Sequence, residues 1–300
     1  MRRRELPHGP PHLVPRGRVQ RLNGFLRVVH PFPSALDAAT AAAIALVAGA
    51  EPAVAARLAV AMLGFQFAIG VTNDLADAPS DRLTHPRKPL ATGVLSSRDV
   101  EGVLIVALSV GIIGAASVGI GPLTIGLVGF ADGLLYDLRL KGTPFAWLAF
   151  AVGVGLLPVY AWWGATGGLP LALLGVAAMA VFAGAALALA NALADLEKDA
   201  EAGTATVATM LGRVRTLASD ICLLISLQVV VLATSLLSGP DVAAIATELA
   251  GAGLAWAGLL LSADRREGLR RLGWEAQAVA IAVMGVGWLA ALGSAGLLGQ

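Results

Sequence analysis

The sequence predicts an all-α membrane protein, on the basis of its apolar composition, its long uncharged runs and a motif that occurs twice. Of the 300 residues, 57% are hydrophobic and only 14% are charged, whereas about a quarter of the residues are charged in an ordinary soluble domain. The mean hydropathy is +0.78. This composition excludes an ordinary soluble protein and predicts several membrane-spanning helices.

Nine apolar runs are candidates for transmembrane helices, which need about 20 residues each. The first and the fourth runs are the shortest and the least secure. The nine predicted spans cover residues 33–50, 53–73, 100–119, 121–136, 145–163, 169–191, 216–238, 241–262 and 275–298.

The positive charges are distributed as expected for a chain whose N-terminus is cytoplasmic. Seven Lys or Arg residues precede the first span, and four, two, three and four lie in the loops after spans two, four, six and eight. Of the 21 positive residues, only Arg57 falls on the other side. Because positively charged loops stay in the cytoplasm, we expect a multi-pass protein of the cell membrane with an external C-terminus.

The chain divides into a short arm and one large domain. Residues 1–26 are rich in Arg, Pro and Gly without periodicity, which predicts a flexible basic arm near anionic lipid headgroups. Residues 27–300 are expected to form a single transmembrane domain, because no polar stretch is long enough for another. The basic segment 263–274 predicts a short interfacial helix with Trp274 as its anchor. Nothing indicates a nucleic acid or an obligate protein partner.

A nine-residue motif ends the second and the sixth predicted spans. Residues 73–81 read NDLADAPSD, and residues 191–199 read NALADLEKD. Four spans separate the two copies, an even number, so both copies emerge on the same, cytoplasmic face. The recurrence predicts a four-helix pseudo-repeat followed by a ninth helix.

The two copies predict two acidic stripes, because residues four apart lie on one face of a helix. Pro79 is expected to distort or end the first helix before Asp81. A solvated loop would explain a single copy, but two copies at equivalent helix ends favour a site. Carboxylates this close repel one another unless divalent cations lie between them, and oxygen ligands completed by a substrate phosphate suit Mg²⁺. The candidate metal-binding residues are Asn73, Asp74, Asp77, Asp81, Asn191, Asp195 and Asp199.

The first copy resembles the NDxxDxxxD motif, and the second the DxxxD motif, of the UbiA superfamily of intramembrane prenyltransferases. The resemblance covers about residues 25–298. It implies a ring of helices around a central cavity that opens laterally to lipid. It also implies that a prenyl diphosphate binds there through Mg²⁺, at an active site on the cytoplasmic side, with its isoprenoid tail among the helices.

Basic residues after the first motif are candidates for binding the diphosphate. Arg82, Arg87 and Lys88 follow the first copy within seven positions, and similar sequences follow this motif in the family. The alternative is that these charges serve only to orient the chain in the membrane.

The loop after the fourth span reads YDLRLKGTP and resembles the family's Tyr-x-x-x-Lys element, but here Tyr136 and Lys141 are five residues apart. Either Arg139 or Lys141 could therefore bind phosphate, and Lys141 is preferred. Near the start of the first span, Arg27 or His30 could contact the acceptor or the diphosphate.

Asp132 and Tyr136 are the candidate catalytic residues. They are four residues apart, hence on one helical face, and an ionisable residue inside a bilayer usually faces a cavity. Asp132 would orient an acceptor or accept a proton. Asp37 is a weaker candidate of the same kind, and Asp220 and Glu248 have no assigned role.

These residues predict a Mg²⁺-dependent prenyltransferase that moves an isoprenoid group from a prenyl diphosphate to a hydrophobic acceptor, aromatic or lipid-like, with release of diphosphate. One alternative is a terpene cyclase of the same superfamily that acts on the prenyl diphosphate alone. A cation-coupled membrane transporter is a further alternative. The clustering of the acidic residues on one face, rather than at the middle of the membrane, counts against the transporter.

Overall fold

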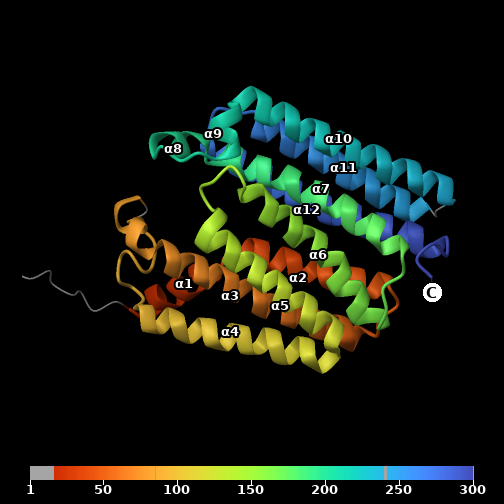
Figure 1. The fold of residues 1–300 in the computed structure, drawn as a ribbon, viewed down its shortest axis with the longest axis horizontal. Helices are drawn as coiled ribbons and strands as arrows, with labels where there is room; N and C mark the ends of the chain where they lie inside the picture. Colours follow the sequence, from red (N-terminus) through yellow and green to blue (C-terminus); the bar gives the residue numbers. More distant parts are fainter. Residues whose placement is uncertain (1–16, 85, 240–241, 300) are drawn as a thin grey trace, which may run out of the picture.

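The structure, a computed structural model, describes residues 17–84, 86–239 and 242–299. These residues form helices joined by short loops, and none of them lies in a strand. In Figure 1 the long helices run side by side across the picture, and their ends form two opposite ends of one bundle.

Seven of the helices in the described segments are long and apolar enough to cross a membrane. Two further apolar helices, α2 (Pro31–Val47) and α5 (Ile120–Leu135), have only 17 and 16 residues and correspond to the first and fourth predicted spans. The length of the helices therefore supports seven spans, and the number nine stays a prediction, as does the four-helix repeat. The seven long helices are α3 (Pro52–Thr84), α4 (Ser97–Val118), α6 (Ala146–Thr166), α7 (Ala172–Ala194), α10 (Arg213–Ser238), α11 (Val242–Ser262) and α12 (Glu267–Ser294).

Four short elements lie at the left-hand end of the bundle in Figure 1: α1 (Arg18–Val28), the π-helix η1 (Tyr136–Leu140), α8 (Leu196–Glu201) and α9 (Val207–Leu211). Helix α1 begins within the segment that we expected to be an irregular arm. Val28 at its end is buried in a cluster with Val71 of α3. Residues 1–16 of the predicted arm lie outside the described residues.

Local signals explain where several helices begin and end. The Ser96 side chain accepts a hydrogen bond from the backbone N–H of Asp99, and the Asp99 carboxylate accepts one from the backbone N–H of Ser96. This reciprocal pair satisfies two N–H groups that the first turn of α4 leaves free. Helix α6 ends at Gly167, whose φ of 74° is favourable for glycine and strained for other residues.

Three pairs of adjacent helices meet backbone to backbone. A Cβ atom on Gly64 of α3 would lie 2.7 Å from the carbonyl oxygen of Ala107 in α4. One on Gly184 of α7 would overlap the backbone of α6 at Phe150, and one on Gly258 of α11 would lie 2.8 Å from the carbonyl oxygen of Gly273 in α12. Small residues at such crossings let membrane helices pack closely, so the pairs α3–α4, α6–α7 and α11–α12 are tightly joined.

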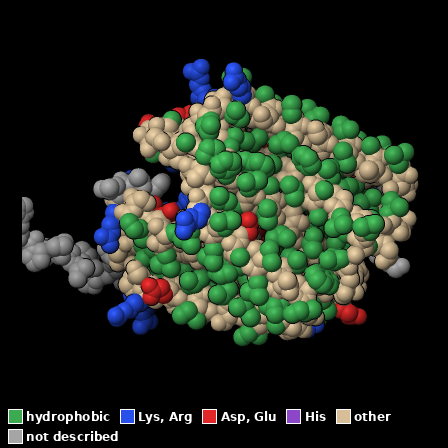
Figure 2. All heavy atoms as spheres, in the orientation of Figure 1, with side chains coloured by type: hydrophobic (Ala, Val, Ile, Leu, Met, Phe, Trp, Pro, Cys, Tyr) green, Lys and Arg blue, Asp and Glu red, His purple; other side chains and the backbone are tan. Residues whose placement is uncertain are grey.

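The surface has the character expected of a membrane protein. Figure 2 shows a face covered mainly by hydrophobic side chains, with Lys and Arg gathered toward the left and upper-left edge. Large apolar side chains such as Ile105, Ile113 and Leu237 are exposed. Lipid would cover such side chains, whereas water would not favour them.

The segment 263–274 differs from its prediction. Helix α12 begins at Glu267 and continues without a break to Ser294, so there is no separate interfacial helix. Trp274 does not anchor the chain at the surface; its ring packs edge-to-face on Phe32 of α2, with 5.9 Å between the ring centres. The amphipathic start of a long helix was mistaken for an independent element.

Candidate functional site

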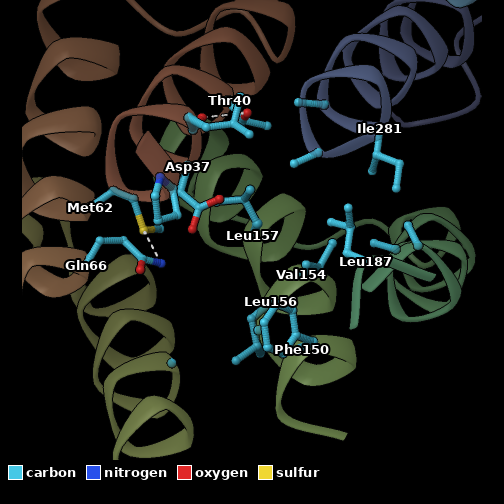
Figure 3. Close-up of a pocket in the computed structure, with 18 of the residues that line it drawn as sticks. Asp37, Thr40, Met62, Gln66, Phe150, Val154, Leu156, Leu157, Leu187 and Ile281 are labelled. Atoms are coloured by element: carbon cyan, nitrogen blue, oxygen red, sulfur yellow. Dashed lines mark hydrogen bonds between the residues drawn. The ribbon is translucent and has the colours of Figure 1, made fainter. Parts of the chain in front are cut away.

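A cavity of about 420 Å³ lies among helices α2, α3, α5, α6, α7, α10 and α12. Most of its lining is apolar, as the close-up in Figure 3 illustrates. Its polar lining toward the end of the bundle that carries both motifs includes His30, Asn73, Tyr136, Asp137 and Asn191. Both copies of the motif thus begin at the mouth of one apolar cavity.

The first motif lies on a continuous helix. Helix α3 runs through Pro79 to Thr84, so of the two effects expected of Pro79, a distortion or an end of the helix before Asp81, the second does not occur. Asp74 and Asp81 are both 3% exposed, and Asp77 is half-buried. The backbone carbonyl that Pro79 cannot pair with belongs to Leu75, one turn earlier, and the helix tolerates that loss as many membrane helices do.

Lys88 neutralises this acidic stripe from the loop that follows α3. Its ammonium nitrogen lies 3.1 Å from Asp74 Oδ1, 3.6 Å from Asp77 Oδ2 and 2.8 Å from Asp81 Oδ2. Burial alone would lower the pKa of Lys88, but its hydrogen bond to Asp81 and the charge of Asp74 raise the pKa above its ordinary value. The three carboxylates of the first motif therefore converge on one cation.

His30 reaches the same stripe from the start of α2. Its Nε2 lies 3.4 Å from Asp74 Oδ1. His30 has a φ of 48°, the only positive φ among the described residues other than glycine. A left-handed conformation is strained for a side chain of this size, and here it turns the chain just before Pro31 so that the imidazole faces α3.

The π-helix η1 explains an unusual spacing. The backbone N–H of Lys141 donates a 2.8 Å hydrogen bond to the carbonyl of Tyr136, five residues earlier. An α-helix brings residues four apart onto one side, whereas a π turn does so for residues five apart. The extra residue between Tyr136 and Lys141 is therefore absorbed, and Lys141 Nζ lies 2.5 Å from Asp77 Oδ2.

Asp137, a site residue that our sequence analysis missed, lies in the same π turn. Its Oδ1 accepts a 2.7 Å hydrogen bond from the side-chain amide of Asn73, and its Oδ2 is buried with no partner among the described residues. Burial raises the pKa of Asp137 to about 6, although the bond from Asn73 opposes the rise. Its position next to Tyr136 was the only available signal in the sequence.

The second motif is not a continuous helical stripe. Helix α7 ends at Ala194, Asp195 follows with φ −103° and ψ 9°, and α8 begins at Leu196. Asn191 lines the cavity, whereas Asp195 is exposed. Burial raises the pKa of Asp199, and the charge of Asp195 raises it further.

Arg270 of α12 fixes the end of α7, a role that the sequence did not reveal. The buried guanidinium donates to the carbonyl of Leu193 at 2.7 Å and to that of Ala194 at 3.4 Å, and it pairs with Glu197. These carbonyls are among those that the end of a helix leaves without partners. The clamp holds the chain just before Asp195.

Tyr136 lines the cavity together with Asn73 and Asn191, the first residues of the two motifs. Its ring packs edge-to-face on Phe150, with 5.7 Å between the ring centres. Burial is the main cause that raises the pKa of the Tyr136 hydroxyl. Four carboxylates are close enough to raise it further through their charge, and they come from the π turn and from both motifs: Asp137, Asp77, Asp195 and Asp199.

The three basic candidates other than Lys88 and Lys141 form no ion pair with these carboxylates among the described residues. Arg82, Arg87 and Arg139 are exposed, and none of them forms an ion pair with another described residue. Of the two candidates after the fourth span, the structure thus places Lys141, rather than Arg139, against the first motif. Lys198 lies on the surface, where it pairs with Glu267 at 2.5 Å and with Asp195 of the second motif at 3.8 Å.

The acidic residues inside the bundle divide into two groups. Asp37 and Asp132 both line the cavity. Asp220 and Glu248 do not; Asp220 is buried near Gln277, and Glu248 accepts a 2.5 Å hydrogen bond from Ser235. Asp132 and Tyr136 share the cavity wall, as their spacing suggested.

The donor atoms of the two motifs fit a hard divalent cation such as Mg²⁺, because they are carboxylate and amide oxygens. Within the described ranges, no three Asp, Glu, His or Cys side chains already surround a common metal position. The first motif instead surrounds the Lys88 ammonium, which shows that its three carboxylates can converge on one positive charge.

A helical bundle with an apolar chamber, and with paired acidic motifs at its mouth, defines a multi-pass membrane protein of the intramembrane prenyltransferase type. Residues 36–281 match the UbiA prenyltransferase family. The chain therefore belongs to this family. No curated protein matches the sequence.

Several solved structures share the fold. The apo structure of a UbiA homologue from Aeropyrum pernix K1 is 19% identical, with a TM-score of 0.69, over 85% of this chain and 96% of that one. A UbiA homologue from Archaeoglobus fulgidus, bound to GPP and Mg²⁺, is 18% identical, with a TM-score of 0.66, over 87% of this chain and 99% of that one. A digeranylgeranylglyceryl phosphate synthase is 13% identical, with a TM-score of 0.66, over 90% and 98%.

Proposed function

We propose that the protein is a Mg²⁺-dependent intramembrane prenyltransferase that moves an isoprenoid group from a prenyl diphosphate to a hydrophobic acceptor and releases diphosphate. The observation that carries this proposal is that Asn73 and Asn191, the first residues of the two acidic motifs, line the same apolar cavity as Tyr136. The family match supports it, as do the Archaeoglobus fulgidus structures that contain GPP or DMAPP together with Mg²⁺.

The acidic motifs would hold the metal. The first would contribute Asp74, Asp77 and Asp81 with Asn73, and the second Asn191, Asp195 and Asp199. When bound, Mg²⁺ supplies positive charge that stabilises the diphosphate leaving group.

Basic residues of the chain neutralise the same leaving group. Lys88 and Lys141 both reach the carboxylates of the first motif, so they lie where a metal-bound diphosphate would be. Arg82, Arg87 and Arg139 are exposed near the same end of the bundle and would contact the diphosphate only after a change of side-chain conformation.

The cavity protects the reacting carbon from water. As the bond between C1 and the diphosphate oxygen breaks, its electron pair leaves with diphosphate and C1 gains positive charge. An apolar lining keeps water from this carbon, so the acceptor forms the new bond to C1. The acceptor's proton passes to a carboxylate in the wall, for which Asp132 is placed. Tyr136 orients the acceptor or the diphosphate through its hydroxyl group.

The distribution of charge supports the orientation inferred from the sequence, with the N-terminus and the active site at the cytoplasmic side and the C-terminus outside. Residues 27–300 act as one transmembrane domain in this proposal. Lipid surrounds it, and no protein partner is needed for the chemistry.

The proposal is tested with purified protein, a prenyl diphosphate and a panel of acceptors, with products measured by mass spectrometry. We expect Asp77→Ala and Asp195→Ala to lower the rate of transfer by about 100-fold or more, because each variant lacks a carboxylate that would hold Mg²⁺, whose positive charge stabilises the leaving group. Glu201→Ala, an exposed acid in α8, is the matched control. Transfer by both motif variants at the wild-type rate would contradict the proposal, and a hydrocarbon formed without acceptor would identify a cyclase.

A further inference from the structure

The cavity has two chemically different walls. Residues of α6, α7 and α12, such as Val154, Leu187 and Ile281, form an apolar wall (Figure 3). Asp37 of α2, Gln66 of α3 and Asp132 of α5 lie on the other side, and we call these three residues the polar wall. Figure 3 shows Asp37 and Gln66 extending from neighbouring helices toward the same space.

The polar wall lies deeper in the bundle than the diphosphate site. Asp37 is seven residues from His30, and Gln66 is seven residues from Asn73, which at 1.5 Å per residue places both about 10 Å farther along their helices. An isoprenoid tail has no hydrogen-bonding group to offer at that depth. The polar wall therefore serves a different ligand from the tail, for which the apolar wall is suited.

The side chains of the polar wall have few hydrogen-bond partners within the protein. Among the described residues, neither Asp37 nor Asp132 has a side-chain hydrogen bond or an ion pair, and the amide nitrogen of Gln66 has only the Met62 sulfur at 4.0 Å. Polar groups inside a membrane are costly when they lack partners and usually mark a functional site. A bound molecule would supply the missing partners.

The charge of the polar wall restricts what it can bind. No Lys or Arg lines the cavity, and His30 at its mouth is the only basic side chain among the described lining residues. Two carboxyl groups without a cation beside them repel an anion and attract hydrogen-bond donors. We propose that Asp37, Gln66 and Asp132 form the acceptor subsite, and that it takes a neutral or cationic donor such as a phenol or an amine. This inference rests on the proposed prenyltransferase function.

Binding of three small aromatic probes to the purified protein tests the proposal without requiring turnover. Hydroquinone is neutral, tyramine is cationic and 4-hydroxybenzoate is anionic, and each carries a phenol. We expect hydroquinone and tyramine to bind at least about tenfold more tightly than 4-hydroxybenzoate in titration calorimetry, a difference typical of hydrogen bonds to charged groups.

Matched variants test whether the polar wall causes the preference among the three probes. Asp37→Asn keeps the shape but removes the charge, and we expect it to reduce the preference for tyramine over 4-hydroxybenzoate by about tenfold. Gln66→Met, a second variant of similar size, should weaken hydroquinone binding. Asp220→Asn, at a buried aspartate that does not line the cavity, should leave all three dissociation constants unchanged.

Two results would overturn the subsite: 4-hydroxybenzoate binding as tightly as the other probes, or a preference that Asp37→Asn does not change. Failure of all three probes to bind would also overturn it. Binding of a prenyl diphosphate with Mg²⁺, measured in parallel, distinguishes failure of the acceptor subsite from failure of the proposed function. If the wild-type protein does not bind the diphosphate, the function itself is wrong; if it does, only the subsite fails.

Discussion

The side-chain amide of Asn73 donates a 2.7 Å hydrogen bond to Oδ1 of Asp137, which lies 64 residues later in the chain. The bond joins the first acidic motif on α3 to the π turn after α5. An amide nitrogen that donates to Asp137 fixes which way the amide faces, and so leaves the Asn73 carbonyl oxygen available as a ligand.

The first prediction concerns this bond. Asp137→Ala should weaken the apparent affinity for Mg²⁺ by about tenfold or more, because partners that orient a metal ligand typically contribute this much. The measurement is the Mg²⁺ concentration that gives half-maximal transfer. Asp264→Ala, at a half-buried acid that pairs with Arg266, should leave this concentration unchanged. An unchanged value in Asp137→Ala would show that Asn73 does not need its partner.

The second prediction separates two cations of one loop. Lys141→Met should raise the KM for the prenyl diphosphate by about tenfold, because an ammonium that bonds a charged group contributes about 1.5–3 kcal/mol. Arg139→Met should change the KM little, since Arg139 is exposed and pairs with no described acid. Steady-state kinetics measures the KM of both variants. A larger rise in KM for Arg139→Met than for Lys141→Met would assign the phosphate role to Arg139.

The third prediction concerns Lys88 and metal removal. Without its ammonium, the carboxylates of Asp74, Asp77 and Asp81 repel one another. Lys88→Ala should lower the free energy of unfolding by about 2 kcal/mol in the presence of a chelator. Millimolar Mg²⁺ should restore most of the loss, because a divalent cation supplies the same counter-charge. Thermal unfolding with and without Mg²⁺ measures both effects. An equal loss in the two conditions would mean that no metal replaces the lysine.

The fourth prediction compares two glycines of α7. Gly184→Ala should destabilise the fold by about 1–3 kcal/mol, because the added Cβ meets the backbone of α6 at Phe150 and Ala151. Gly175→Ala meets nothing within 4 Å and should not destabilise, since alanine favours a helix more than glycine does. Unfolding of both variants in detergent tests this, and equal stability would show that the α6–α7 crossing is loose.

The sequence predicts well the long apolar helices and the end of the bundle at which the candidate site lies, because both depend on local patterns. Apolar runs of about 20 residues specify helices directly. The predicted even number of spans between Asp77 and Asp195 would place both motifs at one end, and Figure 1 shows α3 and α7 ending at the same end of the bundle. The two spans that length does not support, at α2 and α5, are also the shortest runs.

The details that build the site depend on contacts between distant residues, and local patterns do not reveal them. The sequence marks Lys88 as a candidate for binding phosphate, but only the folded loop shows that it lies against Asp74, Asp77 and Asp81. Asp137 and Arg270 acquire their roles through Asn73 and through the carbonyl groups of α7. Pro79 is a different case: the sequence predicts that it distorts or ends the helix, and the structure shows that α3 continues through it.

The glycine crossings have a mechanical consequence. Where α3 meets α4, α6 meets α7 and α11 meets α12, there is no side-chain layer that could be compressed or rearranged. We therefore expect each pair of helices to move as one rigid body. We expect any opening that admits a long lipid-like molecule into the cavity to occur between these helix pairs and not within them.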